Sequence, residues 1–577
     1  MMWSSMVSVF YSQVASDISS SISIELCKPE RRHHFVTMEN LAGQQFVYEV
    51  TSLRALFLLL LLSPFLFLIM RNARATTLMF DTKRTRGHRQ PADRQQSLPP
   101  SPPAVPVLGH LHLVGSLPHV SLRSLARTLG ADLMLLRLGS TPVLVVSSSS
   151  AAEAVLRTHD HVFASRPHAL VSEVVLYGPS DVGFAPHGDC WRRGRKLITT
   201  HLLSVNRVQS FRHAREEEVS VVMGRIAEAA AAGAAVDVGE LLGSFTNDLA
   251  CRAVMGKSFR SEGRNKLFRE LVLDTTKLLV GFNVEDFFPF LARFGVLSKL
   301  VRAKSERLRR RWDELLDRLI EDRESKYEAA AASDLKDDDD DNFIHVLLSV
   351  RQEYGHITRE QMKALLQDVF IGGIDSTSSL LEFTMAELMR KPRVMNKLQA
   401  EVRSSTPEGH DGVVGEDSLE HMAYLRAVTK ESLRIHNVTP LLAPHLSMDS
   451  CTIDGYTVPV GVQVLINSWA IGRDTRYWGD DAEEFVPERF MDGGSAVHVS
   501  FKGSDFEFLP FGSGRRMCAG VNFAMATVEL MLANLVHRFD WDLPPGQEGR
   551  DIDVSQVFGL VVRRKKKLLL VPKLRVY

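Results

Sequence analysis

The chain has 577 residues, 45% of them hydrophobic and 24% charged, a composition typical of a globular protein with a large core. Its 69 basic and 69 acidic residues balance, so charge gives no reason to expect nucleic-acid binding. The five cysteines form no Cys-x-x-Cys pair, which argues against a zinc site or a disulfide framework: Cys27, Cys190, Cys251, Cys451 and Cys518.

An apolar run, Ala55–Met70, dominates the N-terminal region. It is shorter than the ~20 residues that span a bilayer, but Leu53 extends it if the Arg54 side chain reaches the interface. Basic residues follow the run, so the positive-inside rule places the rest of the chain in the cytosol. We therefore expect a single transmembrane helix within a membrane anchor, residues 38–74. A signal peptide is the alternative, but the run lies far from Met1 and lacks a small-residue cleavage site.

The segments on either side of this anchor have different characters. Residues 1–37 are Ser-rich, and Met38 begins a more compact lead, so we interpret 1–37 as a non-native extension or the product of an alternative start. Residues 75–106 are basic and then Pro-rich, which predicts a stiff, extended linker. The remainder, 107–577, is expected to be one large catalytic domain.

Hydrophobic periodicity in this domain predicts a mainly α fold with small β-sheets. Strands are expected at 133–139, 142–148, 458–467 and 561–571, and the acidic run 337–341 is expected in a solvated loop. The clearest helical patterns cover 151–163, 215–231, 302–327, 358–390, 419–435 and 521–537.

The segment 508–520, FLPFGSGRRMCAG, carries the most specific chemical signal. It has the spacing F-x-x-G-x-R-x-C-x-G, formed by Phe511, Gly514, Arg516, Cys518 and Gly520. Cys518 precedes a predicted helix, whose amides and dipole favour an anionic sulfur. A thiolate suits haem iron, and Arg516 suits a haem propionate. A structural cysteine is the alternative, which five defined residue types within ten positions oppose.

This segment resembles the haem-binding loop of the cytochromes P-450, and the resemblance extends over roughly residues 98–575. It implies the cytochrome P-450 fold and haem b, with Cys518 as the iron ligand. Glu431 and Arg434, spaced so as to share a helix face, would pair with Arg489 of Pro-Glu-Arg-Phe in a structural network. The same spacing at Glu387 and Arg390 is interpreted as a surface pair.

Other residues receive roles from the same resemblance. Trp191 and Arg195 in WRRGR would hold the haem propionates, and His445 stands where many relatives carry a propionate-binding arginine. A basic patch around Arg192, Arg193 and Lys196 would suit an acidic electron donor, or else is a solvated face.

The segment 370–379, FIGGIDSTSS, resembles the family's helix over the oxygen-binding face of the haem. Gly372 and Gly373 would open space there, and Asp375 with the next hydroxyl would relay protons. Ser376 replaces the usual threonine and Thr377 follows, a departure that leaves the hydroxyl less restricted. The alternative is a polar cluster at a break in the helix.

Apolar segments expected to face the substrate are 169–188, 369–376, 438–444 and 557–561, which predicts a small hydrophobic substrate. Their apolar residues are Leu176, Tyr177, Phe184, Leu441, Leu442, Phe558 and Leu560. LVGSLPHVSLRSLAR (113–127) and FASRPHAL (163–170) resemble plant microsomal members, most of all the grass indole and indolinone hydroxylases. The expected function is insertion of one atom of O2 into an indole-, phenylpropanoid- or terpene-derived compound.

Electrons would come from NADPH through a separate reductase, because the chain lacks a G-x-G-x-x-G loop for a nicotinamide. We expect the protein in the endoplasmic reticulum membrane, with the catalytic domain facing the cytosol and no nucleic-acid partner. The alternatives are a haem-thiolate isomerase or dehydratase, which needs no proton relay, and a non-catalytic haem-binding membrane protein.

Overall fold

The computed structural model describes residues 97–575, apart from 259, 261–264, 282, 291–295, 334–341, 355–356 and 407–411. The predicted anchor, the N-terminal extension and the acidic run lie outside these residues. Within the described part of the chain, no helix combines the length and apolarity needed to cross a membrane.

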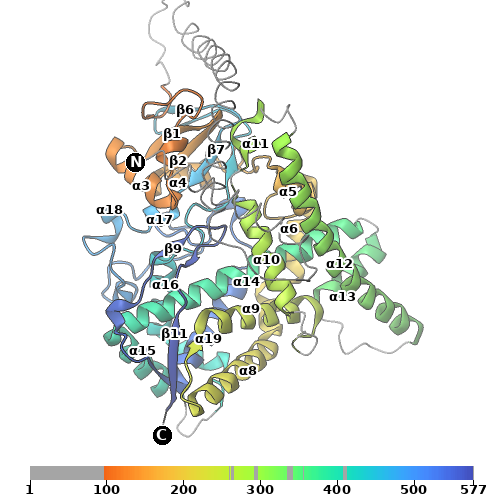
Figure 1. The fold of residues 1–577 in the computed structure, drawn as a ribbon, viewed down its shortest axis with the longest axis vertical. Coiled ribbons are helices and arrows are strands. Elements are labelled where there is room, and N and C mark those ends of the chain that lie inside the picture. Colours follow the sequence, from red (N-terminus) through yellow and green to blue (C-terminus); the bar gives the residue numbers. More distant parts are fainter. Residues whose placement is uncertain are drawn as a thin grey trace, which may run out of the picture. The chain divides into compact units, whose positions relative to one another are not determined.

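Helices make up most of the described chain, as predicted (Figure 1). Their bounds are α3 Pro118–Leu129, α4 Ser149–Glu153, α5 Leu170–Val175, α6 Asp189–His201, α7 Val205–Ser210, α8 Arg212–Ala231, α9 Val238–Met255, α10 Asn265–Leu279, α11 Val284–Phe287, α12 Val296–Ser333, α13 Phe343–Tyr354, α14 Arg359–Arg390, α15 Pro392–Ser404, α16 Ala423–Ile435, α17 Ser468–Ile471, α18 Thr475–Trp478 and α19 Val521–Arg538.

Two predicted helices differ from the structure at their ends. The helix expected over 151–163 is α4 followed by a π-helical turn, Ala154–Thr158, after which the chain turns away. The helix expected over 419–435 begins with a 3-10 turn, Glu416–His421, and α16 starts only at Ala423. By contrast, α14 matches its prediction, because Thr358 and Gln361 form a capping box at its start.

Four strands form the largest sheet, in the order β1 (Leu133–Leu138), β2 (Thr141–Val146), β7 (Gln463–Ile466) and β4 (His445–Leu446). β2 and β7 are parallel, and the outer pairs are antiparallel. The remaining strands are β3 Val236–Asp237, β11 Leu569–Leu574 and β8 Phe539–Asp542 in a three-stranded sheet, and the pairs β5 Cys451–Ile453 with β6 Tyr456–Val458 and β9 Gln556–Val557 with β10 Arg563–Arg564.

The strand predicted over 458–467 is therefore divided between β6 and β7, and the one over 561–571 between β10 and β11. Gly461, with φ +80°, turns the chain between β6 and β7. The Pro-rich residues assigned to the linker contact the catalytic domain. The Leu135 amide of β1 donates to the Pro100 carbonyl at 2.9 Å, and His110 Nε2 donates to the Pro102 carbonyl at 2.8 Å.

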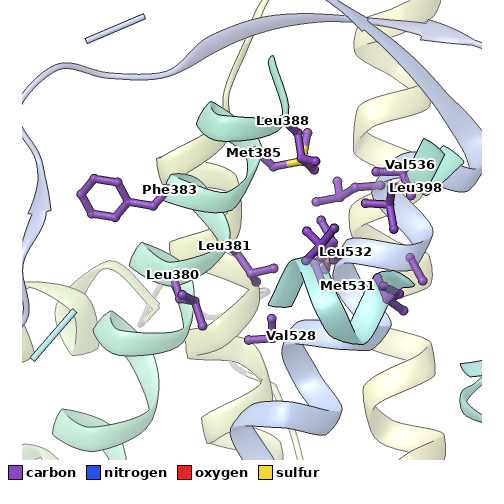
Figure 2. Packing of buried hydrophobic residues seen from close by; sticks show 14 of the residues in the cluster. Leu380, Leu381, Phe383, Met385, Leu388, Leu398, Val528, Met531, Leu532 and Val536 are labelled. Carbon is purple, nitrogen blue, oxygen red and sulfur yellow. The ribbon is translucent and has the colours of Figure 1, made fainter. Parts of the chain in front are cut away.

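The helix α14 lies at the centre of the largest hydrophobic core, where it contacts α9, α16 and α19 (Figure 1). Leu381, Met385 and Leu388 point from α14 toward the side chains of α19 (Figure 2). Phe383 points to the other side, where its ring stacks on His436 at 4.5 Å between centroids (Figure 2). This packing holds α14 against α19, the helix that follows Cys518.

Candidate active site

The loop before α19 is held in one conformation by glycines and by an ion pair. Gly514 has φ +68°, and a Cβ there would lie 2.4 Å from the Leu156 carbonyl oxygen. Asp160 bonds the Arg515 side chain at 2.6 Å. The Cys518 amide donates to the Phe511 carbonyl at 2.9 Å. Only glycine fits at position 514, because any side chain would meet main-chain atoms.

The Cys518 side chain is accessible, although protein surrounds it closely enough for burial to dominate its electrostatics. Burial raises the pKa of the Cys518 thiol, while the Gly520 amide and Arg195 lower it in part. The Gly520 amide at the start of the helix thus favours the anionic sulfur, and desolvation of the thiol opposes it.

Arginine side chains predicted from the motifs converge beside this cysteine. Arg516 donates to three main-chain carbonyls, those of Ala164 at 2.7 Å, Val182 at 3.2 Å and Ala185 at 2.6 Å. Burial lowers the pKa of Arg516 to about 10, so it stays charged at neutral pH. Arg195 donates to the Met517 carbonyl at 2.6 Å, one residue before Cys518.

Trp191 stacks against this group and lies 5% exposed. The Arg516 guanidinium carbon lies 4.2 Å from the centre of its ring, a cation–π contact. Its indole nitrogen donates to the Val182 carbonyl at 3.1 Å, so Trp191 and Arg516 share one acceptor. The structure thus places Trp191, Arg195 and Arg516 together, as the resemblance implied.

His445 lies nearby but is poorly suited to donate to an anion. Its Nδ1 donates to the Phe163 carbonyl at 2.7 Å, and burial lowers the pKa of the ring to about 3. A neutral ring with Nδ1 protonated leaves Nε2 as an acceptor. The predicted propionate contact of His445 therefore requires protonation of the ring.

Arg166 is a buried cation that the sequence analysis missed. It donates to the carbonyls of Gly183 at 3.1 Å, Ala443 at 2.7 Å and Pro444 at 2.9 Å. The only sequence signal is an arginine among small and apolar residues in FASRPHAL. Arg166 joins the segment before α6 to the strand that carries His445.

The middle of α14 is continuous, so the alternative of a helix break at 370–379 is wrong. A Cβ added to Gly372 or Gly373 would meet nothing within 4 Å, which shows open space on that face of the helix. Ser376 Oγ donates to the Gly372 carbonyl at 2.7 Å, and Thr377 is buried. The serine hydroxyl therefore lies beside the open face.

Asp375 has a partner that the sequence did not indicate. Its carboxylate forms an ion pair with Arg563 of β10, at 15% and 33% side-chain exposure respectively. Burial raises the pKa of Asp375, and Arg563 opposes that rise. The β9–β10 pair thus contributes to the electrostatics of the predicted relay.

The predicted structural network is present and fully buried. Arg434 bonds both carboxylate oxygens of Glu431 at 2.7 Å, and Arg489 Nε donates to Glu431 at 3.2 Å. Arg434 also donates to the main-chain carbonyls of Gly472, Ala482 and Glu484. Glu387 and Arg390 were predicted to form a surface pair, and this prediction is wrong. Glu387 is buried and bonds His436 at 2.8 Å as well as Arg390.

Residues expected to face a substrate divide into two groups. Leu176, Tyr177 and Leu441 are buried in the core, and the Tyr177 hydroxyl donates to Asp313 at 2.9 Å. The half-buried apolar residues at the edges of the core clusters are Phe184, Leu442, Phe558 and Leu560.

These residues fit a haem. An accessible thiol, two nearby arginines and a glycine pair with open space are the features that an iron porphyrin with two propionates requires. Ala519 and Phe523, just after Cys518, pack on the same cluster as Phe370 and Ile374 of α14. The thiol loop and the glycine face therefore border one region.

Comparisons with known proteins agree with this geometry. Residues 99–571 match the family model of cytochrome P450. The chain is 53% identical to an indole-2-monooxygenase of Zea mays over 83% of its length and 88% of that relative. It is 48% identical to an indolin-2-one monooxygenase of Zea mays over 89% and 95%. A zebrafish cytochrome P450 structure matches in fold, with a TM-score of 0.64 and 24% identity over 80% of this chain and all of that one.

Proposed function

The chain belongs to the cytochrome P450 family and is a haem-thiolate monooxygenase, and we propose that its substrate is an indole-derived compound such as indole or an indolinone. The observation that carries this proposal is the 53% and 48% identity to monooxygenases named for those compounds. The half-buried Phe184, Leu442, Phe558 and Leu560 suit a flat, apolar substrate.

Different residues of the chain would hold the haem and transfer protons. Haem iron, when bound to Cys518, supplies oxygen activation. Arg516 and Arg195 would hold the propionates through donors that their main-chain bonds leave available. Asp375 would take up a proton from solvent, and Ser376 Oγ would pass it toward the open face at Gly372.

We further propose that electrons arrive from NADPH through a separate reductase. Arg192, Arg193 and Lys196 are exposed on α6, the helix that also carries Arg195, so an acidic partner docked there would lie near the haem. The anchor at 38–74 would hold the catalytic domain on the cytosolic face of the endoplasmic reticulum. Fractionation of the full chain and of a form lacking residues 1–74 tests this location.

Product analysis with the full chain, a plant reductase and NADPH tests the substrate. Indole, indolin-2-one, a phenylpropanoid and a terpene should be compared, with Cys518→Ala as the inactive control. Hydroxylation of indole or indolin-2-one with matching consumption of NADPH supports the proposal. Turnover of only the phenylpropanoid or terpene contradicts the substrate, and turnover without NADPH supports the isomerase alternative.

A further inference from the structure

Two carboxyl groups, the buried Asp181 and the half-buried Asp368, lie against one short segment, residues 181–185, between α5 and α6. Asp368 of α14 accepts a hydrogen bond from the Val182 amide at 2.6 Å. Its other oxygen would lie 3.6 Å from a Cβ placed on Gly183. Asp181 is 1% exposed and accepts from the Phe184 amide at 3.0 Å. The amides of this segment therefore point toward carboxylates.

The carbonyls of the same segment point toward cations. Val182 accepts from both Trp191 and Arg516, and Ala185 accepts from Arg516 at 2.6 Å. Gly183 accepts from Arg166 at 3.1 Å. The segment is thus a main-chain connection with acidic side chains on its amide side and the haem-side arginines on its carbonyl side.

Only one of the two carboxylates connects the segment to another element. Asp181 belongs to the segment itself, and its Oδ1 has no hydrogen-bond partner within the described part of the chain. Asp368 belongs to α14, two helical turns before Asp375. It joins the segment that holds Arg516 to the helix that carries the predicted proton relay.

We propose that Asp368 is a positioning residue: its bond to Val182 fixes residues 181–185 against α14 and so fixes the Trp191–Arg516 pair, which would hold a haem propionate. A buried amide left without an acceptor is costly, and the Asp368 side chain supplies the acceptor for the Val182 amide. The placement depends on family membership and not on the identity of the substrate.

The same arrangement explains how two faces of the haem would be kept in register. Arg516 belongs to the thiol loop, and Ser376 to the oxygen side. Without Asp368, the segment would remain bonded to Arg166 and Arg516, but no side-chain hydrogen bond among the described residues would tie it to α14.

Hydrogen exchange of the holoenzyme tests this proposal in Asp368→Ala, Asp368→Asn and the control Glu360→Gln. Glu360 is also an acid on α14, but it is 55% exposed and pairs with Arg309. In Asp368→Ala, we expect exchange of the amides at 182–185 to rise about ten-fold, and haem transfer to an acceptor protein to accelerate about ten-fold. Asp368→Asn, which keeps one acceptor oxygen, should lie between, and Glu360→Gln should match the wild type.

Hydrogen exchange of the α8 amides distinguishes a positioning role of Asp368 from general destabilisation of the fold. A rise confined to 181–185 supports the proposal, and an equal rise in α8 overturns it. Exchange and haem transfer within two-fold of the wild type in Asp368→Ala also overturn it. If Asp368→Ala does not fold, the same two measurements on Asp368→Asn decide, with a result equal to the wild type counting against the proposal.

Discussion

Removing Arg434 should destabilise the catalytic domain more than any other single arginine change in the network. The guanidinium is 0% exposed and makes five hydrogen bonds: two to Glu431 and one each to the carbonyls of Gly472, Ala482 and Glu484. Arg434→Ala leaves these three carbonyls without that donor and leaves the Glu431 carboxylate with Arg489 and the Val486 amide.

The magnitude follows from this burial. Breaking a buried ion pair by removing one partner costs about 3–5 kcal/mol, because the remaining charge stays desolvated. A domain has only about 5–15 kcal/mol of stability, so the loss is a large fraction of the total. Arg390→Ala removes an arginine at the same spacing from its acid, but Arg390 is 33% exposed and Glu387 keeps its bond to His436. We expect that control to cost about 1 kcal/mol or less.

Urea unfolding of the holoenzyme, followed by circular dichroism and by the haem absorbance, measures both effects. A double-mutant cycle with Glu431→Ala and the double variant isolates the contribution of the pair. We expect the sum of the two single costs in unfolding free energy to exceed the cost of the double variant by about 2–3 kcal/mol. A free energy of unfolding for Arg434→Ala within about 1 kcal/mol of the wild type would refute this expectation, and so would two single costs that simply add.

Three further predictions concern the loop, the relay and the buried histidines. Gly514→Ala should cost about 2–4 kcal/mol, from the positive φ and the 2.4 Å approach to Leu156, whereas Gly461→Ala, with φ +80° but open space, should cost only about 1–2; equal unfolding midpoints would contradict this. Ser376→Ala should lower the coupling of NADPH consumption to product about ten-fold or more, and unchanged coupling would remove Ser376 from the relay. His445 and His119 have pKa values lowered by burial to about 3 and about 4, below the unfolded value near 6.5, so the unfolded state binds more protons and stability falls as pH drops below 6.5. Between pH 7 and 5.5, each histidine should lower the free energy of unfolding by roughly 1 kcal/mol. If a His119→Asn variant loses stability with falling pH as steeply as the wild type, His119 is not one of the groups responsible.

The sequence alone predicted the features that depend on local pattern. Cys518, Arg516 and Gly514 were recognisable because the loop requires defined residue types at defined spacings over a short distance. Glu431 and Arg434 share a helix face by periodicity, and α14 follows from its hydrophobic pattern and capping residues.

The contacts decided by tertiary structure join residues far apart in the chain. Nothing local pairs Asp375 with Arg563, brings Asp368 to Val182, or places Arg166 among the carbonyls beside His445. The pKa of Cys518 also depends on burial, which outweighs the helix terminus that the sequence makes visible. Desolvation and long-range pairing are properties of the packed chain, because they depend on which segments surround a group and not on its neighbours in sequence.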